Sequence, residues 1–122
     1  METIFRAKAN ENIQAAEILF ANDMYNASAN RSYYAALHAA VAALEREGFH
    51  VERIEHDKVQ AKLNTELIHR RKLVLGRFRS DLLDLQAVRD IADYASRGVS
   101  KKVAQRQLNR AREYVAALQQ ET

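Results

Sequence analysis

The sequence predicts an all-α fold: a five-helix, mostly antiparallel up-and-down bundle that forms one domain over residues 1–122. The chain has no proline and only three glycines, the residues on which the tight turns of β-sandwiches and barrels depend. Apolar residues recur at steps of three and four along most of the chain, which is the period of an amphipathic helix. A length of 122 residues, 48% hydrophobic and 29% charged, is typical of one folded domain with its own core.

Two helices are expected in the first half of the chain. An apolar stripe predicts the first over residues 3–21, and Asn22 and Asp23 end it. The stripe consists of Phe5, Ala9, Ile13, Ala16 and Phe20. The second is expected over residues 25–47, with Gly48 just beyond its end, where glycine is enriched. Its core face carries Tyr33, Leu37, Val41 and Leu44, and alanines cover much of the remaining surface. Such a helix can be approached closely from several sides.

Three further helices follow a polar connection over residues 49–55. The third helix has its apolar positions at Val59, Leu63 and Leu67. The fourth is expected over residues 78–94, with carboxylates near its start, where they suit the helix dipole, and with Gly98 closing it. Ser100 is expected to cap the last helix. That helix carries Val103, Leu108, Ala111, Val115 and Leu118. Gly48, Gly76 and Gly98 thus separate the helical blocks.

The composition also excludes several classes of protein. The absence of cysteine excludes disulfide scaffolds and Cys-ligated zinc sites. No segment approaches the roughly 18 apolar residues of a membrane span, and charges interrupt the N-terminal region where a signal peptide would lie. His50, His56 and His69 lack the spacing of zinc or di-iron sites, and no glycine-rich phosphate loop is present. We therefore expect a cytoplasmic protein with no metal, no cofactor and no membrane contact.

Charge is distributed unequally along the chain. Residues 1–60 have a net charge of −3, whereas residues 61–122 have a net charge of +6. The densest basic run surrounds Gly76 and consists of Arg70, Arg71, Lys72, Arg77 and Arg79. Such a run is typical of a solvated surface, but its position at a turn between helices also suits contacts with a nucleic-acid backbone. We take these five residues as candidate nucleic-acid-binding residues.

A cation and an imidazole share one face of the second predicted helix. Arg31 and His38 are seven residues apart, about 700° at about 100° per residue, so they point within about 20° of each other. Tyr34 lies between them, and this stripe is rotated away from the core face. A permanently cationic fork beside a group that titrates near neutrality suits phosphate chemistry. The structural alternatives are that Arg31 and His38 are solvated or paired surface residues and that Tyr34 packs at a dimer interface.

These residues carry a resemblance to a known family. The run Asn30-Arg31-Ser32-Tyr33-Tyr34-Ala35-Ala36-Leu37-His38 resembles the signature helix of the HEPN family (higher eukaryotes and prokaryotes nucleotide-binding), in which His follows Arg after four to six residues. Segments 56–59, 82–85 and 88–94, the last followed by Val99-Ser100, are similar to the later helices of that family. The resemblance covers nearly the whole chain. It implies a HEPN-like helical bundle that commonly dimerises, with two Arg/His motifs meeting across a two-fold axis.

The resemblance implies a metal-independent endoribonuclease, often the toxin of a toxin–antitoxin pair with a nucleotidyltransferase antitoxin. RNA supplies its own nucleophile in the 2′-hydroxyl, so a base, an acid and a cation suffice for cleavage. The candidate catalytic residues are His38 as general acid/base, Arg31 as phosphate clamp, and Tyr34 and Ser32 as orienting groups.

Two departures from the family pattern keep other functions open. Ser32 stands where catalytic members often carry Asn, Asp or His. Ala40 stands where a nucleotidylated Tyr can occur, so we expect no such modification at that position. The alternatives are a non-catalytic helical module that binds nucleotide or nucleic acid or docks a partner nucleotidyltransferase, and a purely structural interaction protein.

Overall fold

The structure, a computed structural model that describes residues 3–120, confirms the all-α prediction. Its elements are α1 (Ile4–Ala21), α2 (Tyr25–Arg46), α3 (His56–Lys62), the π-helix η1 (Leu63–Arg70), the 3₁₀ turn η2 (Gly76–Phe78), α4 (Asp81–Tyr94) and α5 (Lys101–Gln119). Because η1 continues α3 without a break, residues 3–120 form five long helical segments. No strand occurs between residues 3 and 120.

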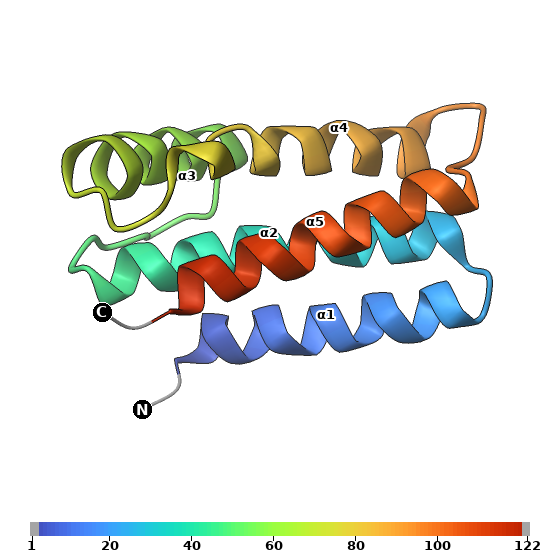
Figure 1. Cartoon of the computed structure of the whole chain (residues 1–122), viewed down its shortest axis with the longest axis horizontal. Coiled ribbons are helices and arrows are strands. Elements are labelled where there is room, and N and C mark those ends of the chain that lie inside the picture. The colour runs from blue at the N-terminus through green and yellow to red at the C-terminus, as the bar shows by residue number, and fades with distance from the viewer. Residues whose placement is uncertain (1–2, 121–122) are drawn as a thin grey trace.

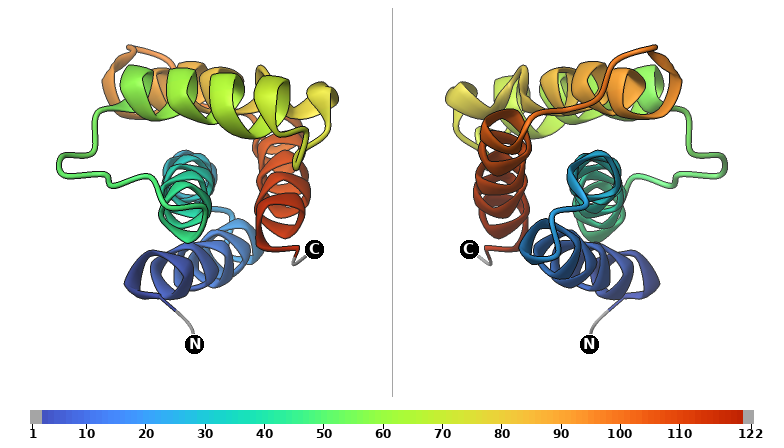
Figure 2. Two further views of the ribbon diagram at one scale, coloured as in Figure 1. Left: turned by 90° about the vertical axis from the view of Figure 1, so that its left-hand side faces the viewer. Right: turned by 90° about the vertical axis from the view of Figure 1, so that its right-hand side faces the viewer.

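Helix α2 is the centre of the bundle. It contacts α1, α3, α4 and α5 (Figure 1), and it lies between α1 on one side and the layer of α3, η1 and α4 on the other, with α5 alongside (Figure 2). Its predicted core face is buried, and its alanines let the neighbouring helices approach closely. The buried residues of α2 include Tyr33, Ala35, Ala36, Leu37, Ala39, Ala40, Val41, Ala43 and Leu44.

Two helices begin at hydroxyl caps. Ser100 Oγ accepts a hydrogen bond from the Val103 backbone N–H at 3.2 Å, which confirms the predicted cap of α5. Thr3 Oγ1 accepts from the Arg6 backbone N–H at 3.1 Å in the same way, so the predicted first residue of α1 is its cap. The first turn of α4 contains the expected carboxylates.

Only one of the three glycines directly follows the end of a helix, as the sequence predicts for all three. Gly48 follows α2 with a φ of 91°, as expected for a residue beyond a helix end. Gly76 instead begins η2, and α4 ends at Tyr94, well before Gly98. The chain reverses after α1 and after η1 through left-handed backbone at Asp23 and Lys72. Asp23 thus lies at the predicted end of the first helix, whereas Lys72 takes the turn position that the prediction assigned to Gly76.

The fourth helix also begins later than predicted. Phe78 lies in the 3₁₀ turn η2 rather than in α4 and is buried, with its ring centroid 6.2 Å from that of Tyr114. Hydrophobic spacing alone cannot separate an apolar residue in a packed turn from the first residue of a helix. None of the helices over residues 3–120 combines the length and apolarity needed to cross a bilayer.

Candidate nucleic-acid site on the central helix

The structure brings together three of the four residues proposed for the motif. Arg31, Tyr34 and His38 lie along one partly exposed stripe of α2. The Arg31 guanidinium carbon is 4.9 Å from the centre of the Tyr34 ring, and the Tyr34 and His38 ring centroids are 6.3 Å apart. The Tyr34 ring therefore presents its π face to the Arg31 guanidinium, and it lies between that cation and the His38 imidazole along the helix.

A residue of α1 joins the two ends of this stripe. Arg31 Nη1 donates a hydrogen bond to Asn12 Oδ1 at 3.0 Å, and Asn12 Nδ2 lies 3.3 Å from His38 Nδ1. Asn12 is 9% exposed, so its amide is held between the two helices and not in solvent. The side chain of Asn12 thus connects the cation and the imidazole directly.

The other side of Arg31 is held by Asn30. Both Nε and Nη2 of Arg31 donate to Asn30 Oδ1. Asn30 Nδ2 in turn donates to Asp93 Oδ2 of α4 at 2.9 Å. A continuous chain of contacts therefore runs from Asp93 through both asparagines to His38 and fixes the guanidinium plane.

Arg89 of α4 completes the cluster. Its Nε lies 2.9 Å from Asp93 Oδ2, and its Nη2 donates to the Tyr34 hydroxyl at 2.9 Å. The Arg89 guanidinium also lies 5.3 Å from the ring centre of Tyr94, a side chain that is 74% exposed. Asp93 therefore forms an ion pair with Arg89. Two guanidinium groups and an exposed aromatic ring consequently lie on one surface of α2 and α4.

His38 sits in surroundings that disfavour its charged form. Burial is the main cause that lowers the pKa of His38 from its ordinary value of 6.5, and the nearby charges of Lys8 and Arg31 lower it further. The ring of Phe5 covers it with a centroid distance of 5.7 Å. His38 is therefore neutral near pH 7. Within residues 3–120, no hydrogen bond reaches its Nε2, the nitrogen that remains for a ligand.

Ser32 lies apart from this cluster. It is 0% exposed and packs into the bundle interior, and its Oγ has no hydrogen-bond partner among the described residues. The helical period explains this position, because the residue after Arg31 is rotated by about 100° toward the core. The structure therefore does not bring Ser32 to Arg31 and His38 as an orienting group.

The five basic residues around Gly76 are all exposed, but most are paired. Ion pairs join Arg70 to Glu66, Arg71 to Glu47 and Arg77 to Glu113. Lys72 and Arg79 form no ion pair within residues 3–120. The cluster is near the C-terminal end of α2, since Arg71 Nη1 donates to the Glu47 carbonyl. It therefore lies roughly 20 Å along α2 from Arg31.

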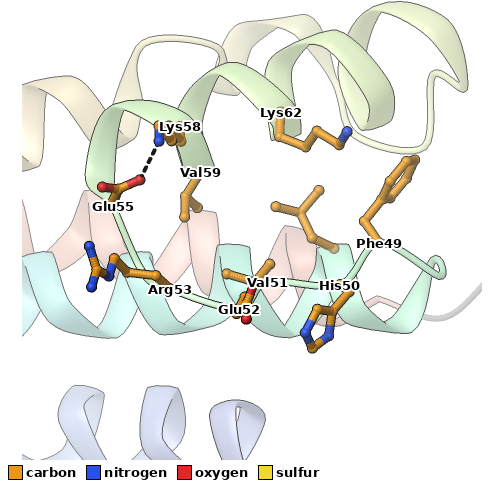
Figure 3. A pocket seen from close by; sticks show the side chains of 10 residues that line it. Phe49, His50, Val51, Glu52, Arg53, Glu55, Lys58, Val59 and Lys62 are labelled. Atoms are coloured by element: carbon orange, nitrogen blue, oxygen red, sulfur yellow. Dashed lines mark ion pairs between the residues drawn. The ribbon is translucent and has the colours of Figure 1, made fainter.

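A cavity of about 450 Å³ opens between α2, α3 and the connection over residues 49–55 (Figure 3). Lys62 Nζ lies 5.0 Å from the ring centre of Phe49, and Lys58 pairs with Glu55 at 2.7 Å on its rim. None of the four motif residues lines it. No group of three or more metal-ligating side chains occurs in the described part of the chain.

Asn12, Asn30 and Arg89 belong to the site although the sequence did not predict them as site residues. A signal for Asn12 was present, because it lies three residues after Ala9 and four before Ala16, within the apolar face of α1. A polar residue at such a position requires a hydrogen-bond partner in the core. Asn30 and Arg89 carried no comparable signal, since their bonds to Asp93 and Tyr34 depend on how α2 and α4 pack against each other.

The fold and site define a helical bundle whose central helix presents an arginine, a tyrosine and a histidine on one surface. A family model described as HEPN domain matches residues 3–121, and the chain belongs to this family. No curated protein sequence matches the chain. Membership supports a nucleotide- or RNA-related function, in a family that often binds nucleic acids and dimerises.

Proposed function

We propose that the chain is a metal-independent endoribonuclease whose site forms around Arg31 and His38 of two copies. One observation carries this proposal: Asn12 and Asn30 hold the guanidinium of Arg31 on the surface that also presents His38. Preorganised cationic donors beside a neutral imidazole are the groups that RNA cleavage by its own 2′-hydroxyl requires.

The proposed reaction needs only proton transfers and charge stabilisation. The imidazole of His38 takes the proton of the 2′-hydroxyl, and the 2′-oxygen forms a bond to phosphorus. The bond from phosphorus to the 5′-oxygen breaks, and His38 of a second copy, present as the imidazolium beside the phosphate, gives its proton to that leaving oxygen. One imidazole is thus charged and one neutral both before and after the step. The products are a 2′,3′-cyclic phosphate and a 5′-hydroxyl. Two of the five N–H donors of Arg31 are left for the phosphate oxygens after its bonds to the asparagines.

A homodimer follows from this chemistry, because each chain places one histidine at the motif and the reaction uses an acid and a base. The partly exposed stripe of α2 and the exposed Tyr94 offer a surface on which a second copy can meet the first. In this proposal the basic residues around Gly76 contact more distant phosphates of the RNA, chiefly through Lys72 and Arg79, which lack ion pairs in the described chain. The physiological regulator would be a nucleotidyltransferase antitoxin.

A non-catalytic binding module is the second candidate, and one observation favours it. Asn12 Nδ2 faces His38 Nδ1, so Nδ1 accepts and the proton of the neutral ring stays on Nε2. In that form the His38 Nε2–H and the Arg31 N–H groups are all donors. Such a set of donors binds a phosphate without being able to remove a proton from it or from the sugar.

Cleavage of mixed-sequence RNA in excess EDTA separates the two candidates. For the enzyme, we expect 2′,3′-cyclic phosphate ends and a loss of rate of at least about a hundredfold in both His38→Ala and Arg31→Ala. Gln14→Ala, an exposed position on α1, serves as the matched control and should cleave like the wild type. RNA binding without cleavage, unchanged by His38→Ala, would overturn the enzyme in favour of the binding module.

A further inference from the structure

The amide of Asn12 has only one orientation that satisfies both of its neighbours. Arg31 is a donor at every nitrogen, so the Asn12 atom that faces Arg31 Nη1 at 3.0 Å must be the oxygen. The Asn12 NH₂ group therefore faces His38 Nδ1 at 3.3 Å, and Nδ1 must supply a lone pair. This assignment follows from the chemistry of arginine and needs no observed hydrogen atom.

We propose that Asn12 is a positioning residue that lets Arg31 determine which nitrogen of His38 carries the proton. While Arg31 holds Asn12 Oδ1, the His38 proton is on Nε2 and the ring is a donor toward the ligand. When a phosphate takes the Nη1–H that Asn12 Oδ1 accepts, the amide is free to turn and accept from Nδ1–H, which leaves a lone pair on Nε2. Cation and imidazole are thereby coupled through one amide.

Burial and charge make this coupling effective. Asn12 is 9% exposed, so water does not readily replace either of its two bonds. The charged and titratable groups around His38 are Lys8 of α1 and Arg31 and Tyr34 of α2, and none of them accepts from Nδ1 in the structure. The amide of Asn12 is the one described hydrogen-bonding partner of the ring.

The inference rests on the proposed function for its catalytic meaning but not for its test. The tautomer of His38 can be measured by NMR from the ¹⁵N and ¹³C shifts of the ring in the RNA-free protein at pH 8. The wild type should show the proton on Nε2. Asn12→Asp places an acceptor beside Nδ1, so the proton should move to Nδ1 and the pKa of His38 should rise by at least about one unit. Asn12→Ala should give a mixture, as in free histidine.

The matched control is Asn10→Ala, which alters an asparagine of the same helix that bonds to Gln119 Nε2. It should leave the tautomer as in the wild type, and circular dichroism should show that all variants remain folded. A wild-type ring protonated on Nδ1, or a tautomer that Asn12→Asp leaves unchanged, would overturn the inference.

RNA cleavage by the same variants tests the functional consequence separately. If His38 acts as the base, Asn12→Asp should raise the cleavage rate by about tenfold at pH 8. In this variant, His38 Nε2 has a lone pair even when no phosphate has displaced residue 12 from Arg31. No cleavage by any variant would count against the ribonuclease while the NMR result still decides the role of Asn12. Cleavage that falls in Asn12→Asp despite the expected tautomer would overturn the coupling as a step in catalysis.

Discussion

Tyr34 makes two contacts that substitutions can separate. Its ring supports Arg31 at 4.9 Å, and its hydroxyl accepts from Arg89 Nη2 at 2.9 Å. Tyr34→Phe keeps the ring, so we expect RNA affinity within about threefold of the wild type. The Arg89 guanidinium also lies 5.4 Å from the Tyr34 ring centre, so Tyr34→Ala removes the stacking surface of both guanidinium groups and should weaken RNA binding by roughly tenfold. Fluorescence anisotropy with a labelled RNA measures both values, and equal losses in the two variants would contradict a role of the ring.

At this scale the sequence predicted part of the site. The seven-residue spacing placed Arg31 and His38 on one stripe because the helical period is fixed by backbone geometry. The same period rotates Ser32 into the interior, where its Oγ is buried. The bridging role of Asn12 could not be predicted, since it depends on how α1 packs against α2.

At the scale of single elements, Gly48 provides a test of the turn after α2. Its φ of 91° lies in the left-handed region, yet a Cβ at this position would meet no atom within 4 Å. Gly48→Ala should therefore reduce the free energy of unfolding by about 1 kcal/mol through backbone strain alone. Gly76→Ala is the matched control, because its Cβ would make only an ordinary contact of 3.9 Å and its φ is not left-handed. Urea titrations compare the two, and equal destabilisation would contradict the argument.

The order of the helices was predictable, but some of their boundaries were not. Periodicity and the residues that begin or end helices located α1, α2 and α5 to within a residue or two, because such signals act over a few residues of sequence. The start of α4 depends on the tertiary packing of Phe78, and the turn at Lys72 follows the end of a π-helix. Leu73 N–H bonds to the Leu67 carbonyl at 2.8 Å as η1 ends, and Phe78 is drawn into the core from η2. Local sequence carries no signal for such a π-helical ending.

At the scale of the whole molecule, two histidines link folding to pH. Burial is the main cause that lowers the pKa of both His38 and His56 from 6.5. Below about pH 6.5, the unfolded chain therefore binds protons more readily than the folded chain. The contribution of these two histidines to the free energy of unfolding is fully present above that pH and is lost as the pH falls. We expect a lower urea midpoint at pH 5.5 than at pH 7.5, with a smaller difference in His38→Gln/His56→Gln. If the urea midpoint of the double variant changes by the same amount between pH 5.5 and pH 7.5, the pH dependence comes from carboxylates and not from these histidines.

The composite site makes a prediction for mixed dimers. If cleavage uses His38 of both copies, a dimer of one wild-type chain and one His38→Ala chain is inactive, because it lacks either the acid or the base. After complete exchange, the fraction of fully wild-type dimers is the square of the wild-type fraction. A mixture with roughly one tenth wild-type chain should therefore retain about one hundredth of the activity of the same total amount of wild type. Mixing with Gln14→Ala instead should leave activity unchanged. If activity falls in simple proportion to the wild-type fraction, each chain carries a complete and independent site. A monomer by light scattering at micromolar concentration would contradict the composite site as well.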